Sequence, residues 1–448
     1  MIIRSISGLR GLAESHLTDS VIRSYASAFH SLTPEGVVYC GRDSRKSGDS
    51  ILEVFFNELI RLGRDVIICG IVPTPTIQYM VEKTESVGGI IVTASHNPTQ
   101  WNGLKFVNEK GTFFSKDQCA NLFDLVDKDI KIDSAQQLGM YLTDQNAILK
   151  HVLSIVELSC IDIQSIRSRN FKIVVDAVNG AGSEALPLLL EHLGCETIKI
   201  HCDSSGIFSR GAEPLPKNLK KLSNKVLSTG SDLGLAVDPD SDRLALVNEK
   251  GEAIGEEYTL VIAALGYLSK KPIKQSFVTN LSTSLALEKM AERYNCSVVR
   301  TAIGEINVVN KMIEIDSHFG GEGNGGVILR ESHLGRDALV GTALILNHLS
   351  GQEKTLSEIH GLLPQFFIEK DKINAKGVDE DVLVKKVKKL FLDSSIDTND
   401  GIKFIWNDSW LHLRKSNTEP IIRIYAESTT KDHAIKLIDI VKSVLADE

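Results

Sequence analysis

The chain has 448 residues, 42% of them hydrophobic and 24% charged, with 50 basic and 58 acidic side chains and a formal charge of −8. This composition is that of a globular protein too long for one hydrophobic core, and its mild acidity argues against a nucleic-acid partner. No apolar run reaches membrane-spanning length, no signal peptide is read, and the seven cysteines form no Cys-x-x-Cys pair. We therefore expect a cytoplasmic protein with reduced thiols and without membrane or nucleic-acid partners.

Residues 1–140 are predicted to form a first α/β domain. Apolar runs predict strands over 36–40, 65–69 and 87–92, and apolar residues at helical spacing predict helices over 48–62 and 74–82. Because strands alternate with helices, we expect a parallel sheet with right-handed crossovers.

Two further α/β domains are predicted over 141–252 and 253–365, each opening near a helix and continuing with strands and helices in turn. The expected strands cover 171–175, 197–200, 233–237, 276–279 and 297–300, and the expected helices 145–158, 258–268, 285–294 and 335–349. The three segments are similar in size, which suggests a triplicated architecture, although they contain no repeated sequence.

Residues 366–448 are predicted to form a small α+β domain. Helices are expected over 381–392 and 431–445, and neighbouring strands over 402–406, 410–414 and 421–426.

The stretch Thr93 to Pro98 (TASHNP) follows the predicted strand 87–92. Ser95 therefore lies where a strand ends and a loop begins, which is where open α/β sheets bind ligands. A serine at this place can act as a nucleophile or carry a phosphoryl group. By itself, the motif fits a serine-rich turn without chemistry about equally well.

The stretch Asp238 to Arg243 (DPDSDR) follows the predicted strand 233–237 and carries carboxylates at 238, 240 and 242. An EF-hand is excluded, because Arg243 stands where that loop needs glycine and the flanks are strands. A solvated acidic turn is the alternative, but three like charges between two apolar strands favour a bound divalent cation, magnesium first. Arg243 would add a fixed positive charge beside a transferring group.

Two more stretches suit a phosphorylated ligand. The stretch Arg414 to Pro420 (RKSNTEP), with Arg423 close behind, crowds donors into a loop between two strands and suits a phosphate dianion, although an ordinary polar hairpin is the alternative. The stretch Gly320 to Gly326 (GGEGNGG) lets a backbone approach a ligand closely, and Glu322 could bind sugar hydroxyls, although glycine clusters are usually only loops. By themselves the charges of Arg10, Arg42 and Lys105 fit a solvated surface, and we interpret His96 as structural.

In this order, the four stretches resemble the α-D-phosphohexomutase family, which includes phosphoglucomutases, phosphomannomutases and phosphoglucosamine mutases. Residues 93–98 resemble its phosphoserine loop, 238–243 its metal loop, 321–326 its sugar-specificity loop and 414–423 its phosphate-binding loop. The resemblance spans the whole chain. It implies an α/β fold of four domains around a central cleft, with three related mixed α/β layers and a C-terminal α+β domain.

The resemblance also implies the reaction, an interconversion of hexose 6-phosphate and hexose 1-phosphate. Phosphorylated Ser95 would donate its phosphoryl group to the sugar, and the bisphosphorylated sugar would turn over in the cleft and return its other phosphate. One Mg²⁺ per chain would be held by Ser95, Asp238, Asp240 and Asp242, and a bisphosphorylated hexose would act as activator.

Roles are implied for further residues. Arg10, Lys105 and Arg243 would serve proton transfer and charge stabilisation, and Glu322 with Asn324 would bind the sugar. The stationary phosphate would be held by the donors of the phosphate-binding loop, which are Arg414, Ser416, Asn417, Thr418 and Arg423.

One departure concerns substrate choice. Many relatives carry serine and histidine where this chain has Asn324 and Gly326, and the form found here looks more like a branch of phosphoglucosamine mutases and dual phosphomannomutase/phosphoglucomutases. We expect a phosphoglucosamine mutase, with the dual enzyme as the alternative. The partners expected are sugar phosphates, and the chain is expected to be a monomer or a homodimer.

Two other functions stay open. A metal-dependent phosphatase would hydrolyse phospho-Ser95 and would have no use for a second phosphate site. A regulator that binds sugar phosphates without turnover would not need the serine and the three aspartates. Because the phosphate-binding loop lies on a separate domain, the last domain, joined near 364–370, is expected to rotate and bring Arg414 and Arg423 over a bound sugar phosphate.

Overall fold

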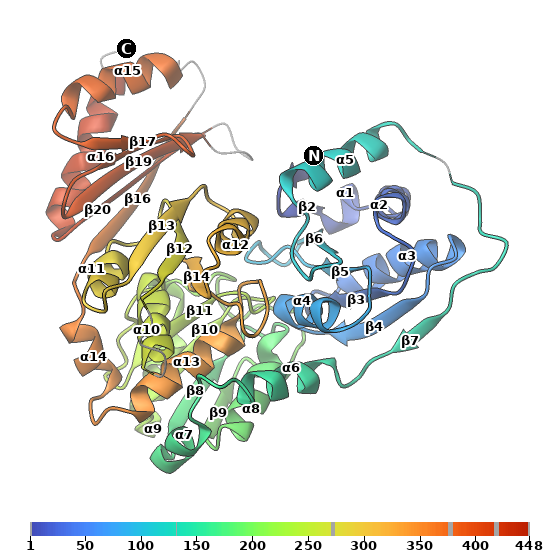
Figure 1. Cartoon of the computed structure of the whole chain (residues 1–448), viewed down its shortest axis with the longest axis horizontal. Coiled ribbons are helices and arrows are strands. Elements are labelled where there is room, and N and C mark those ends of the chain that lie inside the picture. Colours follow the sequence, from blue (N-terminus) through green and yellow to red (C-terminus); the bar gives the residue numbers. More distant parts are fainter. Residues whose placement is uncertain (1, 131, 270–273, 375–379, 416–420, 447–448) are drawn as a thin grey trace.

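The computed structural model describes residues 2–130, 132–269, 274–374, 380–415 and 421–446, and they form four sheets arranged along an arc (Figure 1). The first and fourth sheets lie at the two ends of this arc. Within the described residues, no helix has the length and apolar character needed to cross a membrane.

The first sheet has the strand order β1-β2-β6-β5-β3-β4-β7. Its elements are β1 (Ile3–Ser5), β2 (Gly8–Leu12), α1 (Ala13–His16), α2 (Asp19–Leu32), β3 (Val38–Arg42), α3 (Gly48–Arg61), β4 (Val66–Ile71), α4 (Thr74–Lys83), β5 (Gly88–Val92), β6 (Trp101–Asn108), α5 (Lys116–Asp127) and β7 (Tyr141–Thr143).

The second sheet has the order β11-β10-β8-β9, and the third has the order β13-β12-β14-β15. The elements of the second are α6 (Ala147–Val156), α7 (Ile163–Arg169), β8 (Lys172–Asp176), α8 (Gly182–His192), β9 (Glu196–Ile200), the short 3₁₀ helix η1 (Pro216–Asn218), α9 (Lys220–Thr229), β10 (Leu233–Val237) and β11 (Leu244–Asn248). Those of the third are α10 (Glu256–Leu268), β12 (Ser276–Asn280), α11 (Ala286–Glu292), β13 (Ser297–Thr301), α12 (Glu305–Glu314), β14 (Phe319–Glu322), β15 (Gly326–Leu329), α13 (Ala338–Ser350) and α14 (Leu356–Leu362).

The fourth sheet is antiparallel, in the order β16-β20-β19-β18-β17. Its elements are β16 (Phe367–Asn374), α15 (Glu380–Leu390), β17 (Ser395–Asp397), β18 (Ile402–Ile405), β19 (Ser409–Lys415), β20 (Ile421–Ser428) and α16 (Lys431–Ala446). The expected α+β organisation of this segment is confirmed.

The first sheet is mixed, as the resemblance implies, whereas the alternation of strands and helices indicates only its parallel part. Strands β4, β3 and β5 are parallel, but β6 runs antiparallel to β5. The reason is that only the loop 93–100 joins β5 to β6, and a short loop without a crossover helix can return the chain only antiparallel.

The same four-strand unit occurs in each of the first three sheets. Three parallel strands are followed by an antiparallel fourth, in the spatial orders β4-β3-β5-β6, β9-β8-β10-β11 and β13-β12-β14-β15. In every unit the hairpin between the third and fourth strands is one of the stretches singled out above: 93–100, 238–243 and 323–325. The suggested triplication is therefore present in the topology, although the sequences differ.

Two helices apolar on all sides join the second and third sheets. All residues from Tyr258 to Leu268 of α10 and from Ala338 to Leu349 of α13 are buried, as expected for helices packed on every side. The two helices lie against each other beside the strands of the second and third sheets (Figure 1). Packing on these two helices therefore holds the second and third sheets together.

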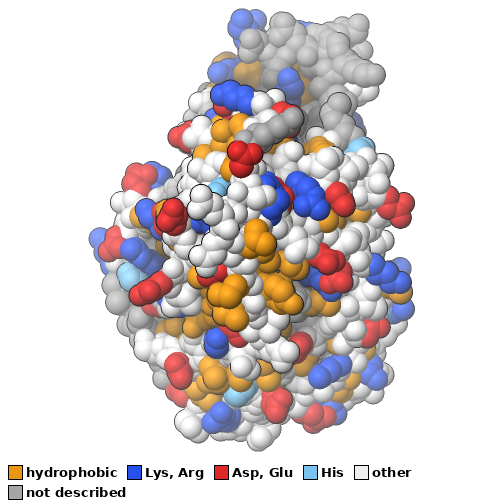
Figure 2. Space-filling model, turned by 90° about the vertical axis from the view of Figure 1, so that its right-hand side faces the viewer, with side chains coloured by type: hydrophobic (Ala, Val, Ile, Leu, Met, Phe, Trp, Pro, Cys, Tyr) orange, Lys and Arg blue, Asp and Glu red, His pale blue; other side chains and the backbone are white. Residues whose placement is uncertain are grey.

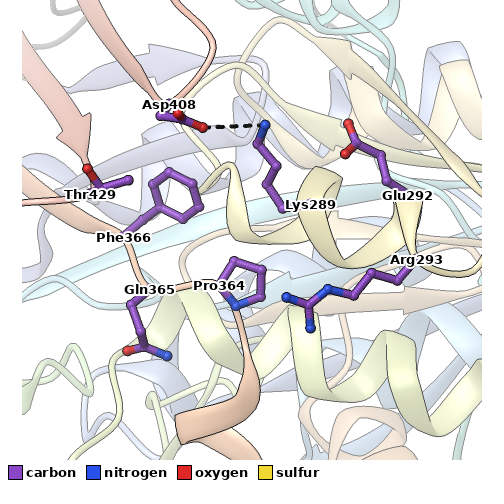
Figure 3. A pocket seen from close by; sticks show the side chains of 8 residues that line it. All are labelled: Lys289, Glu292, Arg293, Pro364, Gln365, Phe366, Asp408 and Thr429. Carbon is purple, nitrogen blue, oxygen red and sulfur yellow. Dashed lines mark ion pairs between the residues drawn. The ribbon is translucent and has the colours of Figure 1, made fainter.

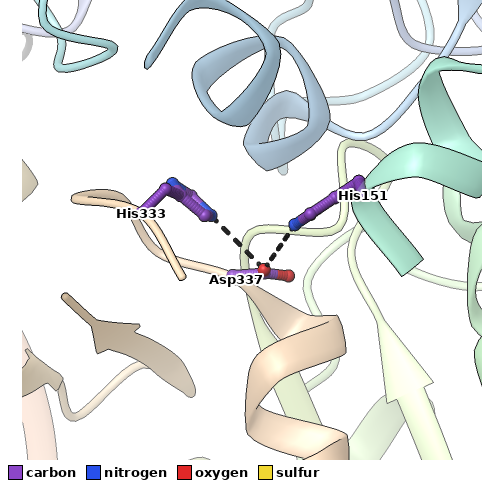
Figure 4. Close-up of side chains that lie close together, drawn as sticks. All are labelled: His151, His333 and Asp337. Atoms are coloured by element: carbon purple, nitrogen blue, oxygen red, sulfur yellow. Dashed lines mark hydrogen bonds and ion pairs between the residues drawn. The ribbon is translucent and has the colours of Figure 1, made fainter. Parts of the chain in front are cut away.

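A buried cluster of His151, His333 and Asp337 ties the first three layers together (Figure 4). One Asp337 carboxylate oxygen lies 3.0 Å from His151 Nε2 and 3.3 Å from His333 Nε2, while the other accepts a hydrogen bond from the N–H of Leu339 and so caps α13. The second nitrogen of His151 lies 3.0 Å from the hydroxyl of Thr76 in α4. Each layer thus contributes a group to one hydrogen-bonded network.

One edge of the first sheet carries an apolar surface. Figure 2 views the molecule from the side of the first sheet and shows hydrophobic side chains gathered near the middle of that face. In the segment 138–142, which includes the edge strand β7, four large hydrophobic side chains are more than half exposed. They are Leu138, Met140, Tyr141 and Leu142.

We expect Asp337→Ala to lower the free energy of unfolding by about 3 kcal/mol, because two buried imidazole groups lose their acceptor and α13 loses its cap. Calorimetric melting measures the loss. Asp371→Ala, which removes an exposed ion pair with Lys442, is the control and should change stability by less than about 1 kcal/mol. Equal effects of the two substitutions would show that the buried network contributes no more to the free energy of unfolding than an exposed ion pair does.

Candidate functional site

Ser95 lies in the hairpin loop between β5 and β6, in the left-handed region with φ 48°. Its N–H donates to the hydroxyl of Thr93 (2.9 Å), which donates to the carboxylate of Asp43 (2.5 Å). Arg45 pairs with Asp43 and donates to the carbonyl of Ser95 (2.8 Å). These buried contacts hold the Ser95 hydroxyl 3.2 Å from a carboxylate oxygen of Asp238.

The loop 238–243 is held from three sides. Backbone N–H groups at the start of α4, before α8 and at the start of α13 donate to three successive carbonyls of the loop. The pairs are Thr74 with Asp240 (2.9 Å), Ala181 with Pro239 (2.8 Å) and Ala338 with Ser241 (3.2 Å). The loop therefore lies where the first three layers meet.

The three aspartates form one buried cluster, with oxygens from each lying within 4.8 Å of one another. Thr74 (2.7 Å) and Lys105 (2.6 Å) donate to one oxygen of Asp240, and Lys105 (3.2 Å) donates to one oxygen of Asp242. The other oxygens of Asp240 and Asp242 are buried and have no hydrogen-bond partner among the described residues. A hard divalent cation needs such oxygens, so the residues fit a Mg²⁺ site.

The electrostatics of the cluster agree with this fit. Burial, and then the neighbouring charges of Asp242 and Asp240, raises the pKa of Asp238 well above its ordinary value. Burial also acts to raise the pKa of Asp242, but the charges of Arg336 and Lys105 outweigh it and hold that pKa low. Three carboxylates in one dry site repel one another, and a cation between them removes the repulsion.

Three further cationic or imidazole groups surround Ser95. Arg10 on β2 donates to the side-chain oxygen of Asn97 (2.8 Å). Arg243 is buried and pairs with Glu213 (2.5 Å). A ring nitrogen of His96 lies 3.3 Å from the Ser95 hydroxyl, and the charge of Arg243, followed by burial, lowers the pKa of His96 well below its ordinary value. His96 is therefore neutral beside the hydroxyl.

Glu322 closes β14 and is buried beside the metal loop. One of its carboxylate oxygens accepts from Asn280 (2.7 Å) and from the N–H of Gly304 (3.1 Å), and the other accepts from Arg336 (2.6 Å). Asn324 lies in the same hairpin, and its side-chain oxygen accepts from the N–H of Gly326 (3.2 Å). The hairpin is also joined to the metal loop, because the N–H of Leu244 donates to the carbonyl of Gly325 (3.0 Å).

The fourth candidate loop is only partly described. Ser416, Asn417 and Thr418 lie outside the described residues. Arg414 on β19 and Arg423 on β20 stand directly opposite each other in the antiparallel register, and Arg414 lies 3.6 Å from Asp400. Like charges directly opposite each other in a sheet are unfavourable, and a bound anion would offset the repulsion.

Family models match almost the whole chain. The four descriptions are phosphoglucomutase/phosphomannomutase alpha/beta/alpha domains I, II and III and the C-terminal domain, over residues 2–133, 149–251, 255–366 and 369–443. The chain belongs to the phosphoglucomutase/phosphomannomutase family. The recognition from four short stretches is thereby confirmed, as is the fold of three α/β domains and a C-terminal domain.

Individual relatives of this family resemble the chain over its full length. A phosphoglucomutase/phosphomannomutase of Thermococcus kodakarensis is 34% identical over 97% of this chain and 96% of the relative. A phosphoglucosamine/phosphogalactosamine mutase of Sulfurisphaera tokodaii is 29% identical over 98% of both chains. The crystal structure of a phosphoglucomutase/phosphomannomutase family protein from Burkholderia thailandensis superimposes with a TM-score of 0.85, at 26% identity, covering 99% of this chain and 98% of that one.

The geometry of this family member brings most of the predicted site residues together. Ser95, Lys105 and the three aspartates contact one another directly, as described above, and Glu322 reaches Asp242 through Arg336. Arg414 and Arg423 lie on the fourth sheet, in another part of the arc (Figure 1). Asp400, which lies 3.6 Å from Arg414, accepts a hydrogen bond from the N–H of Ile303 in the third domain (3.1 Å). The closure of the two arginines over a bound sugar phosphate stays a prediction.

Sequence reasoning missed several residues of the site. Asp43, Arg45 and Thr74 support the Ser95 and metal loops, and Arg336 holds two loops at once. Asp43 and Arg45 stand in the polar loop after β3, and Arg336 stands just before an apolar helix. These residues follow the carboxyl end of a strand or precede the start of a helix, which is where open α/β sheets bind ligands. Charged residues at such places could therefore have been proposed as site residues from the sequence.

We expect Asp240→Asn to lower the affinity for Mg²⁺ by at least roughly tenfold, because the cluster loses a negative charge and a hard oxygen ligand. Isothermal titration with Mg²⁺ alone measures this. Asp393→Asn, at an exposed position after α15, is the control and should bind as the unchanged protein does. If both variants bind Mg²⁺ equally well, the cation is not held by this cluster.

Proposed function

We propose that this chain is a phosphohexomutase that interconverts hexose 6-phosphate and hexose 1-phosphate through phosphorylated Ser95 and a bisphosphorylated sugar. The observation that carries the proposal is the Ser95 hydroxyl, held 3.2 Å from Asp238 in a buried cluster of three carboxylates. Phosphoryl transfer needs positioning and neutralised charge, and this arrangement supplies both. We propose domains over 1–140, 141–252, 253–365 and 366–448 as the working division, although strand β7 (Tyr141–Thr143) pairs with β4 of the first sheet.

In this mechanism the chain's own residues orient the reacting groups. The Ser95 oxygen bonds to phosphorus as the bond from phosphorus to the sugar oxygen breaks, and the proton of the serine passes to the leaving sugar oxygen. Lys105, Arg243 and Arg10 supply positive charge around the transferred group. Asp238, Asp240, Asp242 and Ser95 would hold one Mg²⁺, which when bound would neutralise phosphate charge.

The sugar and its second phosphate are assigned to the other two loops. Glu322 and Asn324 would bind sugar hydroxyls in both orientations of the intermediate. Arg414 and Arg423, with Ser416, Asn417 and Thr418, would hold the phosphate that is not being transferred. A bisphosphorylated hexose would serve as activator by phosphorylating Ser95.

For the substrate we propose glucosamine phosphate first, in line with the name of the Sulfurisphaera tokodaii relative. A dual phosphomannomutase/phosphoglucomutase is the second candidate, because the Thermococcus kodakarensis protein of that name is more similar, at 34% identity. We further propose that the enzyme works in the cytoplasm as a monomer or homodimer.

The same site argues against two rival functions. A phosphatase that hydrolyses phospho-Ser95 would not need the opposed pair Arg414 and Arg423 on a separate domain. A regulator without turnover would not need a serine hydroxyl aimed at a carboxylate cluster.

We expect Ser95→Ala to abolish isomerisation, because no oxygen is left to carry the phosphoryl group. The assay contains Mg²⁺, a trace of glucose 1,6-bisphosphate and, in turn, glucosamine 6-phosphate, mannose 1-phosphate and glucose 1-phosphate. The sugar phosphate that is isomerised fastest identifies the preferred substrate of the enzyme.

The controls of this assay separate the rivals. Ser86→Ala changes a serine outside the site, at the turn before β5, and should isomerise at the unchanged rate. Inorganic phosphate without isomer would establish the phosphatase instead. Unaltered isomerisation in Ser95→Ala would remove Ser95 from the mechanism.

The joint between the third and fourth sheets is suited to domain rotation. A cavity of about 570 Å³ lies at this joint. Figure 3 shows the side chains that line it, which come from α11 and the residue after it, from the segment 364–366 and from loops next to strands of the fourth sheet. Lys289 and Asp408 face each other across it at 3.4 Å. The hydroxyl of Tyr258 donates to the carbonyl of Pro364 (3.0 Å). Polar interfaces of this kind permit relative motion of domains.

We expect small-angle X-ray scattering to show a smaller radius of gyration when glucose 1,6-bisphosphate is added, because Arg414 and Arg423 close over the sugar. The double variant Arg414→Ala/Arg423→Ala is the control and should show no such change. Identical scattering of the unchanged protein with and without the sugar would rule out closure.

A further inference from the structure

We propose that Arg336 is a positioning residue that couples the sugar loop to the metal loop, an inference that rests on the proposed function of these loops. Its guanidinium donates to three carboxylates at once. The distances are 2.6 Å to Glu322, 2.6 Å to Asp242 and 3.0 Å to Glu305. Within the described part of the chain, no other side chain forms a hydrogen bond or ion pair with both Glu322 and Asp242.

The backbone of Arg336 is fixed independently of these contacts. The N–H of Asp337 donates to the carbonyl of Val327 on β15 (2.8 Å), and the Asp337 side chain caps α13 and joins the histidine cluster of Figure 4. The arginine therefore extends from a rigid point. Its planar fork of donors suits simultaneous bonds to several carboxylates, which a lysine could not form in the same geometry.

At both Asp242 and Glu322, Arg336 binds only one of the two carboxylate oxygens. At Asp242 the arginine and Lys105 donate to one oxygen, and the other oxygen is buried without a hydrogen-bond partner among the described residues. At Glu322 the arginine takes one oxygen while Asn280 and Gly304 take the other. Arg336 therefore sets the orientation of a metal ligand and of a sugar ligand together.

The glycine at 326 is explained by the same arginine. A Cβ on Gly326 would lie 2.3 Å from Cδ and 2.9 Å from Cγ of Arg336. The backbone at Gly326 is not in the left-handed region, so the steric demand comes from the arginine stem and not from the backbone. The stem cannot move aside, because its head group is held by three carboxylates. Arg336 thus occupies the space that a larger side chain at 326 would enter.

A purely structural arginine would have a different effect. Removing one partner of a buried ion pair strongly destabilises a fold, because the remaining charge stays buried without compensation. If Arg336 only held the fold together, its removal would lower the melting temperature but leave the Mg²⁺ affinity and the balance of kcat and KM unchanged.

The test compares Arg336→Lys and Arg336→Ala with the control Arg64→Ala, which removes a buried arginine of the first domain that bonds to His30 and to nearby carbonyls. Titration calorimetry with Mg²⁺ alone and steady-state kinetics on the best hexose phosphate are the readouts. We expect Arg336→Ala to weaken Mg²⁺ binding at least fivefold and kcat/KM at least a hundredfold. Arg336→Lys should recover part of both, and Arg64→Ala should affect only the melting temperature.

A double-mutant cycle tests the contact with the loop. Gly326→Ala should lower kcat/KM at least tenfold in the unchanged protein and have almost no further effect in Arg336→Ala. Gly361→Ala is the control, because a Cβ there meets nothing within 4 Å, and it should leave the kinetics unchanged.

Additive effects in the cycle, or an unchanged Mg²⁺ affinity in both Arg336 variants, would overturn the proposal. The calorimetry needs no turnover, so it separates this proposal from the proposed function. If the protein without substitutions lacks mutase activity, the proposed function is refuted. If its Mg²⁺ affinity nevertheless depends on Arg336, the coupling of Arg336 to the metal loop still holds.

Discussion

The burial of three carboxylates in one loop is the constraint on which the rest of the site depends. Asp238, Asp240 and Asp242 are removed from water, and their mutual repulsion has to be offset by positive charge. Lys105 comes from the first sheet and Arg336 from the segment before α13. The cluster therefore assembles only when the first three layers have docked against one another, so the folding of the domains and the formation of the site are one event.

The repeated four-strand topology explains how loops so far apart in sequence meet. Each of the first three sheets presents its candidate loop at the same hairpin, between the third and fourth strands. Packing the units around the buried helices α10 and α13 turns these equivalent hairpins toward a common point. The fourth sheet has another topology and a polar joint, which fits a domain that moves while the other three stay fixed.

Much of this could be predicted from local pattern. The strand 233–237 was predicted with the residues that β10 has, and the helices 48–62 and 74–82 differ from α3 and α4 by one residue at an end. Other elements were not predicted, among them α2, β6 and α5. In β6 the run from Trp101 to Asn108 mixes polar and apolar residues, because Lys105 and Asn102 of this strand face the site and its surroundings. Functional side chains on a strand thus disturb the periodicity that reveals strands.

By itself the sequence determined the family and singled out Ser95 and the three aspartates as the proposed nucleophile and metal ligands, because these inferences depend on residue types at short spacing within single loops. Only the tertiary structure decided which groups support them. Arg336 meets Glu322 and Asp242 across long stretches of chain, and Asp43 and Arg45 meet Ser95 across a crossover. Short-range spacing is a property of the chain, whereas the balance of buried charge is a property of the packed domains, and no local pattern records it.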